Sequence, residues 1–321
     1  MSMTTTPVLM RAIRHDVAGG SDVLRLVEVE RPEPGPTEVL VRVHAAGVNP
    51  IDWKTRTRGG FVHQDPPYTV GYDVAGVVEA VGLGVTSLAP GDDVYGMARF
   101  PHPAGAYAEY VTAPSRHFAR LPRGLDHVHA AALPLAALTA WQALVVTADV
   151  APGQRVLIHG AAGGVGHLAA QIAAARGAHV IGTASPAKHE FLRGLGVAEV
   201  VDYTDVDFAE VVRDVDVVLD TIGGDYPLRS LRTLREGGTL VTIIPPADDF
   251  PYEQARAAGV RAVFVLVEPD AADLREITEL VERDDLRVHV STVLPLADAA
   301  KAHDLGELGR TTGKIVLSVH D

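Results

Sequence analysis

The chain of 321 residues contains no cysteine. This absence excludes disulfide bonds, thiol nucleophiles and every zinc site that is built on thiolates. It also fits a reducing compartment, and we predict a cytoplasmic protein. The first residues, MSMTTTPVLMRAIRHD, hold no continuous apolar core of signal-peptide length, which agrees with that prediction.

Positive charge is scarce as well, with 28 Lys and Arg against 41 Asp and Glu and a formal net charge of −13. This balance argues against nucleic acid or an anionic membrane surface as a partner. Long apolar runs are also lacking. The most apolar segment, residues 130–146, is interrupted by Pro134, Thr139 and Gln142, so a buried helix is favoured over a membrane span.

Two different patterns divide the chain. Residues 8–123 form short alternating runs between Pro and Gly turns, which is typical of a β-barrel-like domain. From Arg155 onward, six short β-branched runs alternate with amphipathic stretches, which predicts a parallel, doubly wound sheet. The last residues return to short strands around one helix. We therefore predict an α/β protein with a discontinuous first domain, residues 1–123 and 289–321, and a second domain, residues 124–288.

The segment IHGAAGGVGHLAAQIA, residues 158–173, follows a predicted strand and opens a predicted helix. Gly163 and Gly166 hold the second and third glycine positions of the dinucleotide-binding fingerprint, and Ala161 replaces the first. Gly163 allows close approach of a pyrophosphate, Gly166 allows close helix packing, and the helix start supplies N–H groups. An ordinary tight turn is the alternative. The predicted cofactor-binding residues of this loop are Gly163, Gly164, Val165 and Gly166.

The end of the second predicted strand, IGTAS, carries no acidic residue, and the next one is Glu190. NAD-binding folds place an acid there, about 20 residues after the glycine loop, where it binds the adenosine ribose. Without it, a 2′-phosphate meets no like charge, and Ser185 and Lys188 can offer a hydroxyl and a positive charge. We predict NADPH as the cofactor. The alternatives are helix capping for Ser185 and a solvated surface position for Lys188.

Several segments together resemble the zinc-independent quinone oxidoreductases of the medium-chain dehydrogenase/reductase superfamily. They are GVNPID, GYDVAGVVEAVG, GAYAEYV, LTAWQAL, AAGGVG and GKIVL, in the expected order over essentially the whole chain. The resemblance implies a GroES-like β-barrel catalytic domain, a Rossmann domain with a six-stranded parallel sheet, a homodimer and NADPH as hydride donor. It also implies cofactor contacts, with core or strand packing as the alternative, at Thr139, Tyr203, Ile243, Ile244, Val265, Val267 and Lys314.

A comparison with the zinc alcohol dehydrogenases of the same superfamily predicts chemistry without a metal. Those enzymes carry a cysteine and a histidine ligand where this chain has Asn49 and Tyr72. Without a Lewis acid, hydride delivery to a quinone or an α,β-unsaturated carbonyl is favoured over oxidation of an alcohol. The candidate catalytic residues are Asn49 as a donor to the substrate oxygen, Tyr72 as a second donor or a buried aromatic, and Asp52 as an orienting residue.

Two other functions stay open at this point. An enoyl-thioester reductase shares the architecture that the resemblance implies, but it would need an acyl pocket and a proton donor. A regulator that binds NADPH without turnover would keep the fold and the glycine loop. The sequence alone names neither the natural acceptor nor the proton donor.

Overall fold

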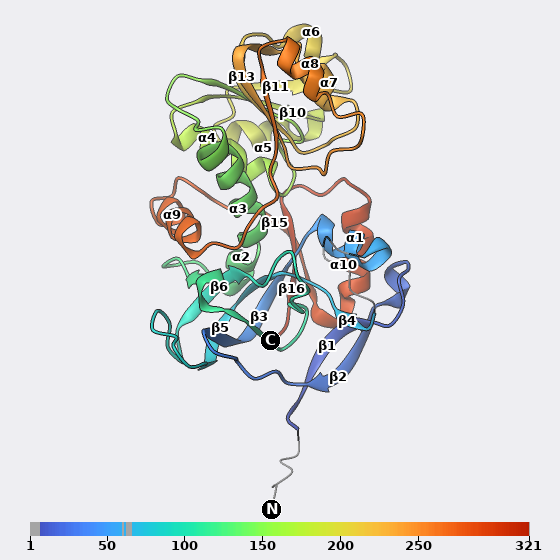
Figure 1. Cartoon of the computed structure of the whole chain (residues 1–321), viewed down its shortest axis with the longest axis vertical. Helices are drawn as coiled ribbons and strands as arrows, with labels where there is room; N and C mark the ends of the chain where they lie inside the picture. Colours follow the sequence, from blue (N-terminus) through green and yellow to red (C-terminus); the bar gives the residue numbers. More distant parts are fainter. Residues whose placement is uncertain (1–6, 60, 62–65, 321) are drawn as a thin grey trace, which may run out of the picture. The chain divides into compact units, whose positions relative to one another are not determined.

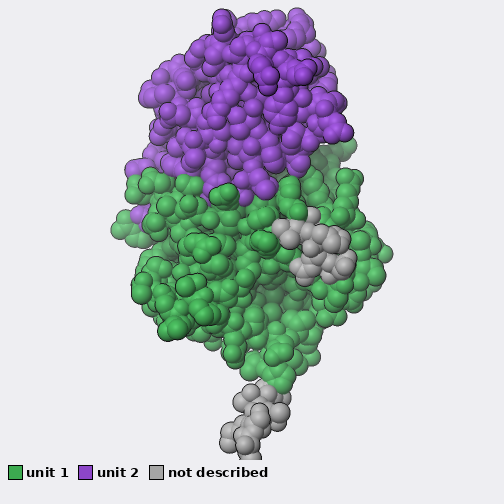
Figure 2. Space-filling model, viewed as in Figure 1, with its two compact units in different colours: residues 1–135, 268–279, 290–321 green, residues 136–267, 280–289 purple. Residues whose placement is uncertain are grey.

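The computed structural model describes residues 7–59, 61 and 66–320. The chain forms two compact units, and each of them is discontinuous in sequence (Figure 2). Unit 1 comprises the chain up to Leu135, Glu268–Glu279 and the residues from Val290 onward, and unit 2 comprises Ala136–Val267 and Leu280–His289. The functional domain boundaries expected from the sequence stay a prediction.

Unit 1 contains two sheets. A three-stranded sheet has the order β2-β1-β4, and a seven-stranded sheet has the order β15-β16-β3-β5-β6-β8, with β7 paired to β3 (Figure 1). The strands are β1 (Leu9–His15), β2 (Arg25–Glu30), β3 (Glu38–Val48), β4 (Tyr68–Thr69), β5 (Asp73–Val81), β6 (Asp93–Met97), β7 (Tyr110–Pro114), β8 (Phe118–Arg120), β15 (Val290–Pro295) and β16 (Lys314–Ser318). Most of these strands contribute apolar side chains to one core, so the expected β domain is confirmed.

The C-terminal strand β16 is built into the sheet that the N-terminal part begins. It pairs antiparallel with β3, and Ile315 lies opposite Val48. This pairing places Lys314, the first residue of β16, beside the end of β3. Residues more than 260 positions apart in sequence therefore meet at one point of unit 1.

Helix α1 (Pro50–Arg58) was not expected from the sequence, where residues 8–123 show little helical periodicity. Its start is set locally. Pro50 occupies the first helical position, and the Asp52 carboxylate accepts a hydrogen bond of 2.8 Å from the N–H of Asn49. Two other helices of the chain are α9 (Ala271–Glu282) and α10 (Ala299–Glu307).

The apolar segment around residues 130–146 is mostly buried, as expected, but it is not a single helix. It forms α2 (His127–Ala131), α3 (Pro134–Trp141) and a π-helix, Gln142–Thr147. Pro134 explains the interruption, because proline lacks the N–H of an interior helical residue and its ring clashes with the preceding turn. Within the described residues, no helix has both the length and the apolar character needed to cross a membrane.

Unit 2 contains a parallel six-stranded sheet with the order β11-β10-β9-β12-β13-β14, which confirms the predicted doubly wound fold. Its strands are β9 (Arg155–Ile158), β10 (His179–Ala184), β11 (Glu199–Asp202), β12 (Val215–Asp220), β13 (Leu234–Thr242) and β14 (Arg261–Phe264). Figure 1 shows the helices on both faces of this sheet. They are α4 (Gly166–Ala175), α5 (His189–Gly194), α6 (Phe208–Val211), α7 (Tyr226–Ser230) and α8 (Tyr252–Ala257).

Candidate functional site

The glycine loop of unit 2 connects β9 to α4 at the carboxyl edge of the sheet, where doubly wound folds bind their ligands. A Cβ atom on Gly166 would lie 2.3 Å from the carbonyl oxygen of Gly160 and 2.7 Å from Cα of Ala161. Neither backbone atom can move without shifting the strand or the loop. The expected packing role of Gly166 is therefore confirmed.

The start of α4 presents backbone N–H groups at the same edge. The first backbone bonds of the helix run from His167 to Gly163 (3.1 Å) and from Ala169 to Val165 (2.9 Å). The N–H groups of Gly164, Val165 and Gly166 precede these bonds, as the first N–H groups of any helix do. Such groups, together with the helix dipole, favour a bound phosphate.

The ends of β10 and β11 bring the expected phosphate contacts to the same edge, because Ala184 lies opposite Asp202 in the parallel pair. Ser185 and Tyr203 directly follow these residues, and Tyr203 is 49% exposed. Lys188 closes a short 3-10 turn that begins after Ser185, and partial burial lowers the pKa of its amine.

The local structure around Ser185 differs from a simple helix start. Ser185 has the extended backbone of a capping residue, but its hydroxyl makes no capping hydrogen bond. The α-helix begins later, at His189, so Lys188 is its N-cap residue and does not lie in its first turn. The expectation that Ser185 caps the helix is wrong for its side chain, because the turn is closed by the backbone bond from Lys188 N–H to the Ser185 carbonyl (3.0 Å).

An acidic residue also lies at this edge. Asp202 ends β11, and its carboxylate accepts bonds from the N–H and the hydroxyl of Thr204 (2.9 and 2.6 Å). The hydroxyl bond is the main cause of the lowered pKa of Asp202. Asp202 therefore carries its negative charge at neutral pH, one strand away from the position where NAD-binding folds place their acid.

The other expected cofactor contacts of unit 2 lie on α3 or follow the last two strands. Thr139 is buried on α3, Ile243 and Ile244 follow β13, and Val265 and Val267 follow β14. The N–H of Ile243 donates to the carbonyl of Asp220 (3.1 Å), and that of Val265 to the carbonyl of Thr242 (2.9 Å). These two N–H groups are therefore used within the sheet, which leaves carbonyl groups and side chains for a ligand.

In unit 1, Asn49 lies between a buried lysine and a buried aspartate. The Nζ of Lys314 donates to the Val48 carbonyl (3.0 Å) and to Oδ1 of Asn49, and Nδ2 of Asn49 donates to Oδ2 of Asp73 (2.8 Å). The Nζ of Lys314 lies 3.7 Å from Oδ2 of Asp73. Burial lowers the pKa of Lys314 and raises that of Asp73. One amide hydrogen of Asn49 is used in this cluster, so one is left for a substrate oxygen.

Asp52 is fully buried next to this cluster. Its Oδ2 accepts hydrogen bonds from the N–H of Asn49 (2.8 Å) and from the hydroxyl of Tyr107 (2.8 Å). Burial, assisted by the negative charge of Asp73, raises the pKa of Asp52 to about 7. A substantial fraction of Asp52 is therefore protonated near neutral pH.

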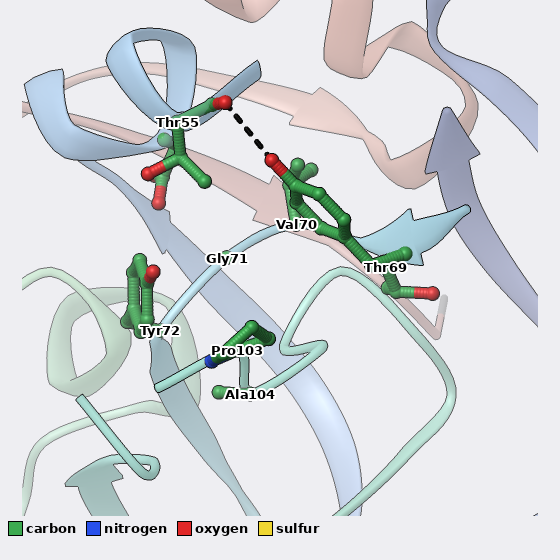
Figure 3. Close-up of a pocket in the computed structure, with 9 residues that line it drawn as sticks. Thr55, Thr69, Val70, Gly71, Tyr72, Pro103 and Ala104 are labelled. Carbon is green, nitrogen blue, oxygen red and sulfur yellow. Dashed lines mark hydrogen bonds between the residues drawn. The ribbon is translucent and has the colours of Figure 1, made fainter. Parts of the chain in front are cut away.

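Tyr72, which immediately precedes β5, lines a small pocket of unit 1 together with Asp52 and Thr55 (Figure 3). The other lining residues are Tyr68, Thr69, Val70, Gly71, Pro103 and Ala104. The free volume is about 10 Å³, roughly the room that one water molecule needs. Burial raises the pKa of Tyr72 to about 12, so its phenol is neutral.

A side chain at Gly71, in the wall of this pocket, would be strained. Its φ is +94°, and a Cβ atom there would lie 2.2 Å from Cδ1 of Tyr107. The segment GYDVAG thus lets the backbone pass close to the ring of Tyr107, whose hydroxyl donates a hydrogen bond to Asp52.

The structure groups the expected residues in two places. Asn49, Asp52, Tyr72 and Lys314 lie in unit 1, and the remaining expected residues lie in unit 2. Lys314 was expected among the cofactor contacts, but it contacts Asn49. Asp73, Tyr107 and Thr55 were not singled out, although Asp73 and Tyr107 lie in the segments GYDVAG and GAYAEYV.

The residues present do not fit a zinc site of the type found in zinc alcohol dehydrogenases. Position 49 offers an amide oxygen that already accepts a bond from a lysine, and position 72 offers a neutral phenol. Zinc in proteins is held by thiolates, imidazoles and carboxylates. Across the described parts of the chain, no group of three or more His, Asp or Glu residues could hold a metal ion.

Two protein-family models match this chain, and a known enzyme is similar to it over almost its whole length. Residues 35–123 match the model of the alcohol dehydrogenase GroES-like domain, and residues 195–317 match the model named zinc-binding dehydrogenase. The 2-haloacrylate reductase of Burkholderia sp is 37% identical over 337 residues, which cover 97% of this chain and 99% of that protein.

Two solved structures extend the comparison. The quinone oxidoreductase from Coxiella burnetii has a TM-score of 0.92 and 39% identity, and the match covers 98% of this chain and 100% of that chain. A mycobacterial protein complexed with NADPH has a TM-score of 0.86 and 33% identity, with 97% and 100% covered. Fold and site thus define an oxidoreductase of the medium-chain dehydrogenase/reductase type. Within that superfamily, the chain belongs to the quinone oxidoreductase family.

Proposed function

We propose that this protein is an NADPH-dependent, zinc-independent oxidoreductase that transfers a hydride to a quinone or an α,β-unsaturated carbonyl. The observation that carries the proposal is the cluster around Asn49. It offers hydrogen-bond donors and a partly protonated carboxyl group where zinc enzymes of the superfamily carry metal ligands. Such groups suit an acceptor that is already electrophilic and needs only charge stabilisation and a proton.

The carboxyl edge of the unit 2 sheet supports NADPH as the cofactor. The glycine loop, Gly163–Gly166, would hold the pyrophosphate, and Ser185, Lys188 and Tyr203 would hold the 2′-phosphate. The complex of a similar mycobacterial protein with NADPH agrees with this choice. When bound, NADPH supplies the hydride. The proposed contacts nearer the nicotinamide are Thr139, Ile243, Ile244, Val265 and Val267. A cofactor contact of Lys314 stays a prediction beside its bond to Asn49.

Two names among similar proteins support the acceptor class. One is a quinone oxidoreductase, and the other is a reductase of 2-haloacrylate, which is an α,β-unsaturated carboxylate. Neither name fixes the acceptor of this chain. A small-molecule acceptor, a cytoplasmic location and a homodimer remain predictions from the sequence and from the resemblance.

The test is a steady-state screen of NADPH oxidation against quinones, alkenals and enoyl thioesters. We expect quinones or alkenals to give the highest kcat/KM. A clear preference for enoyl thioesters would contradict the proposed acceptor and favour an enoyl-thioester reductase. Saturable NADPH binding without oxidation by any of the three classes would favour a regulator without turnover.

A further inference from the structure

Two residues that line the small pocket of unit 1, Asp52 and Thr55, each have a buried side-chain oxygen without a hydrogen-bond partner among the described residues. These oxygens are Oδ1 of Asp52 and Oγ1 of Thr55. The two residues are three positions apart on α1 and therefore share one face of the helix. Buried polar atoms without partners are costly and rare. The pocket is therefore suited to receive a polar group, such as a water molecule or a substrate oxygen.

The two oxygens of Asp52 differ in their surroundings. Oδ2 accepts from the N–H of Asn49 and from the hydroxyl of Tyr107, both at 2.8 Å. Oδ1 accepts from neither. A proton on this carboxyl group therefore sits on Oδ1, where it meets no competing donor. Protonated Asp52 thus carries its O–H on the oxygen that has no partner, in a residue that lines the pocket.

A chain of hydrogen bonds behind Tyr107 fixes this arrangement. Nη1 of Arg56 lies 3.0 Å from Nδ1 of His303, and Nε2 of His303 lies 3.4 Å from the Tyr107 hydroxyl oxygen. Arginine can only donate, so Nδ1 of His303 accepts and its proton is on Nε2. The Tyr107 oxygen then accepts from His303, and its own hydrogen points to Asp52.

At the outer end of this hydrogen-bond chain, Arg56 is held by an ion pair and the ring of His303 is neutral. Arg56 is almost fully buried and is paired with Glu307 at 2.5 Å. Burial, together with the charge of Arg56, lowers the pKa of His303 to about 3, so the ring stays neutral. A neutral ring bonded to a permanent donor has only one tautomer available. The direction of the bond from Tyr107 to Asp52 is therefore set by residues that lie on α1 and α10.

We propose that Asp52 is the catalytic acid of the reaction, that Oδ1 is the atom that gives up the proton, and that Tyr107 and His303 are positioning residues. This inference rests on the proposed function. The hydride that NADPH supplies brings two electrons and one hydrogen to the acceptor, which becomes an anion. The Oδ1–H bond of Asp52 then breaks, and an O–H or C–H bond forms on the acceptor, directly or through a water molecule held at Thr55. Asp52 is left as a carboxylate and regains a proton from solvent.

The charges around Asp52 favour this role over a donor role for Tyr72. Burial is the main influence that raises the pKa of Asp52 to about 7, and Asp73 acts in the same direction. Lys314 and the bonds from Asn49 and Tyr107 act in the opposite direction. General acids work best when their pKa is near the working pH. Tyr72, with a pKa of about 12, is the weaker acid at the same pocket.

The first test measures the proton itself and does not depend on activity. The carboxyl carbons of ¹³C-labelled aspartate are followed by NMR against pH in the enzyme without cofactor, and Asp52→Asn assigns the signal. We expect Asp52 to titrate near pH 7. A midpoint near the ordinary aspartate value of about 4 would overturn the proposal.

The second test uses the same variant in turnover. Asparagine at position 52 can accept both bonds through its oxygen and place its amide at Oδ1, but it cannot give up a proton. We expect NADPH affinity within about twofold of wild type, a kcat lower by about 100-fold or more, and no inflection near pH 7 in the kcat profile. In the wild type, kcat should fall as pH rises through this inflection, because the protonated form is the active one. Asp304→Asn, an exposed change on α10, is the matched control and should change neither quantity.

The positioning role of Tyr107 is tested by the pH of the inflection in the kcat profile. Tyr107→Phe removes a bond to the carboxylate form of Asp52, so the inflection should move to higher pH. An unchanged inflection would contradict this role. An active Asp52→Asn variant would contradict the catalytic role of Asp52 but not the proposed function. A wild-type enzyme without turnover on any acceptor would contradict the proposed function itself.

Discussion

Asn49 is held between two buried, oppositely charged side chains. Its amide links the Lys314 amine to the Asp73 carboxylate, and all three side chains are buried. A buried ion pair is stable only when the remaining hydrogen-bonding capacity of both groups is met. The Val48 carbonyl and the N–H of Leu135 meet part of it here, at 3.0 and 2.8 Å. The side chains of Lys314, Asn49 and Asp73 thus hold one another in place.

In the proposed function, Lys188 is the main positive charge at the 2′-phosphate and therefore sets the cofactor preference. Lys188→Ala should weaken NADPH binding about tenfold or more and leave NADH binding within about twofold, because a charge-assisted bond to the 2′-phosphate contributes roughly 1.5–3 kcal/mol. Fluorescence titration with both cofactors measures this. An equal loss for both would show that Lys188 acts on folding and not on the phosphate.

Asp52 should also make stability depend on pH. Its pKa is raised from 3.8 in the reference state to about 7 in the folded protein, so the folded state binds the proton more tightly. The stabilisation by the bound proton is complete below about pH 4 and is lost as pH rises through about 7. As pH rises from about 4 to about 7, the free energy of unfolding of the wild type should therefore fall relative to that of Asp52→Asn. Urea unfolding at several pH values measures it, and parallel curves for the two proteins would contradict the raised pKa.

Among the elements, strands with a strong pattern could be predicted and the helix that carries Asp52 could not. The six β-branched runs of unit 2 form the parallel sheet as expected. Helix α1 has only nine residues and no apolar stripe, and its start depends on Pro50 and on the bond between Asn49 and Asp52. Such a start is a local contact that periodicity does not report. Pro134 was visible in the sequence, but its effect on the apolar helix was not anticipated.

In the loop between β9 and α4, Gly166 is required for packing, whereas Gly163 has more room around it. Gly166→Ala places a Cβ atom 2.3 Å from a backbone oxygen and should destabilise the protein by about 1–3 kcal/mol. At Gly163 the same atom meets only the Gly160 oxygen, at 3.2 Å. Gly163→Ala should therefore leave stability nearly unchanged and weaken NADPH binding, because it narrows the approach of the pyrophosphate.

Thermal unfolding and NADPH titration of the two variants separate these effects. Gly166→Ala should lower the midpoint of unfolding without cofactor, and Gly163→Ala should lower only the affinity. The account of this loop fails if both variants show the same stability and the same affinity.

At the scale of the whole molecule, the sequence predicted the fold class and the family, but not the composition of the site. The comparison with the zinc enzymes pointed to Asn49 and Tyr72, which stand where those enzymes carry metal ligands, and Asp52 lies in the same segment as Asn49, GVNPID. Tyr107 and His303 come from segments far from Asp52 in sequence and join it only through the fold, and Arg56, one turn further along α1, bonds to His303. Asp73 follows Tyr72 directly, but its bonds to Asn49 and to the N–H of Leu135 are long-range contacts that no motif reports.

Metal removal gives a test at the same scale. The chain has no cysteine, and the amide and phenol at positions 49 and 72 are poor zinc ligands. Dialysis against EDTA should therefore leave kcat/KM unchanged within about twofold. A loss of activity that added zinc restores would overturn the metal-free proposal.

The most direct measurement of the central claim is a single turnover. NADPH is bound to excess enzyme and mixed rapidly with a quinone or an alkenal, and the absorbance of the reduced nicotinamide is followed. The account predicts complete oxidation of the bound NADPH in one phase, with NADH reacting only at much higher concentration. If the bound NADPH stays reduced with both acceptors, the protein is not an NADPH-dependent quinone or enone reductase.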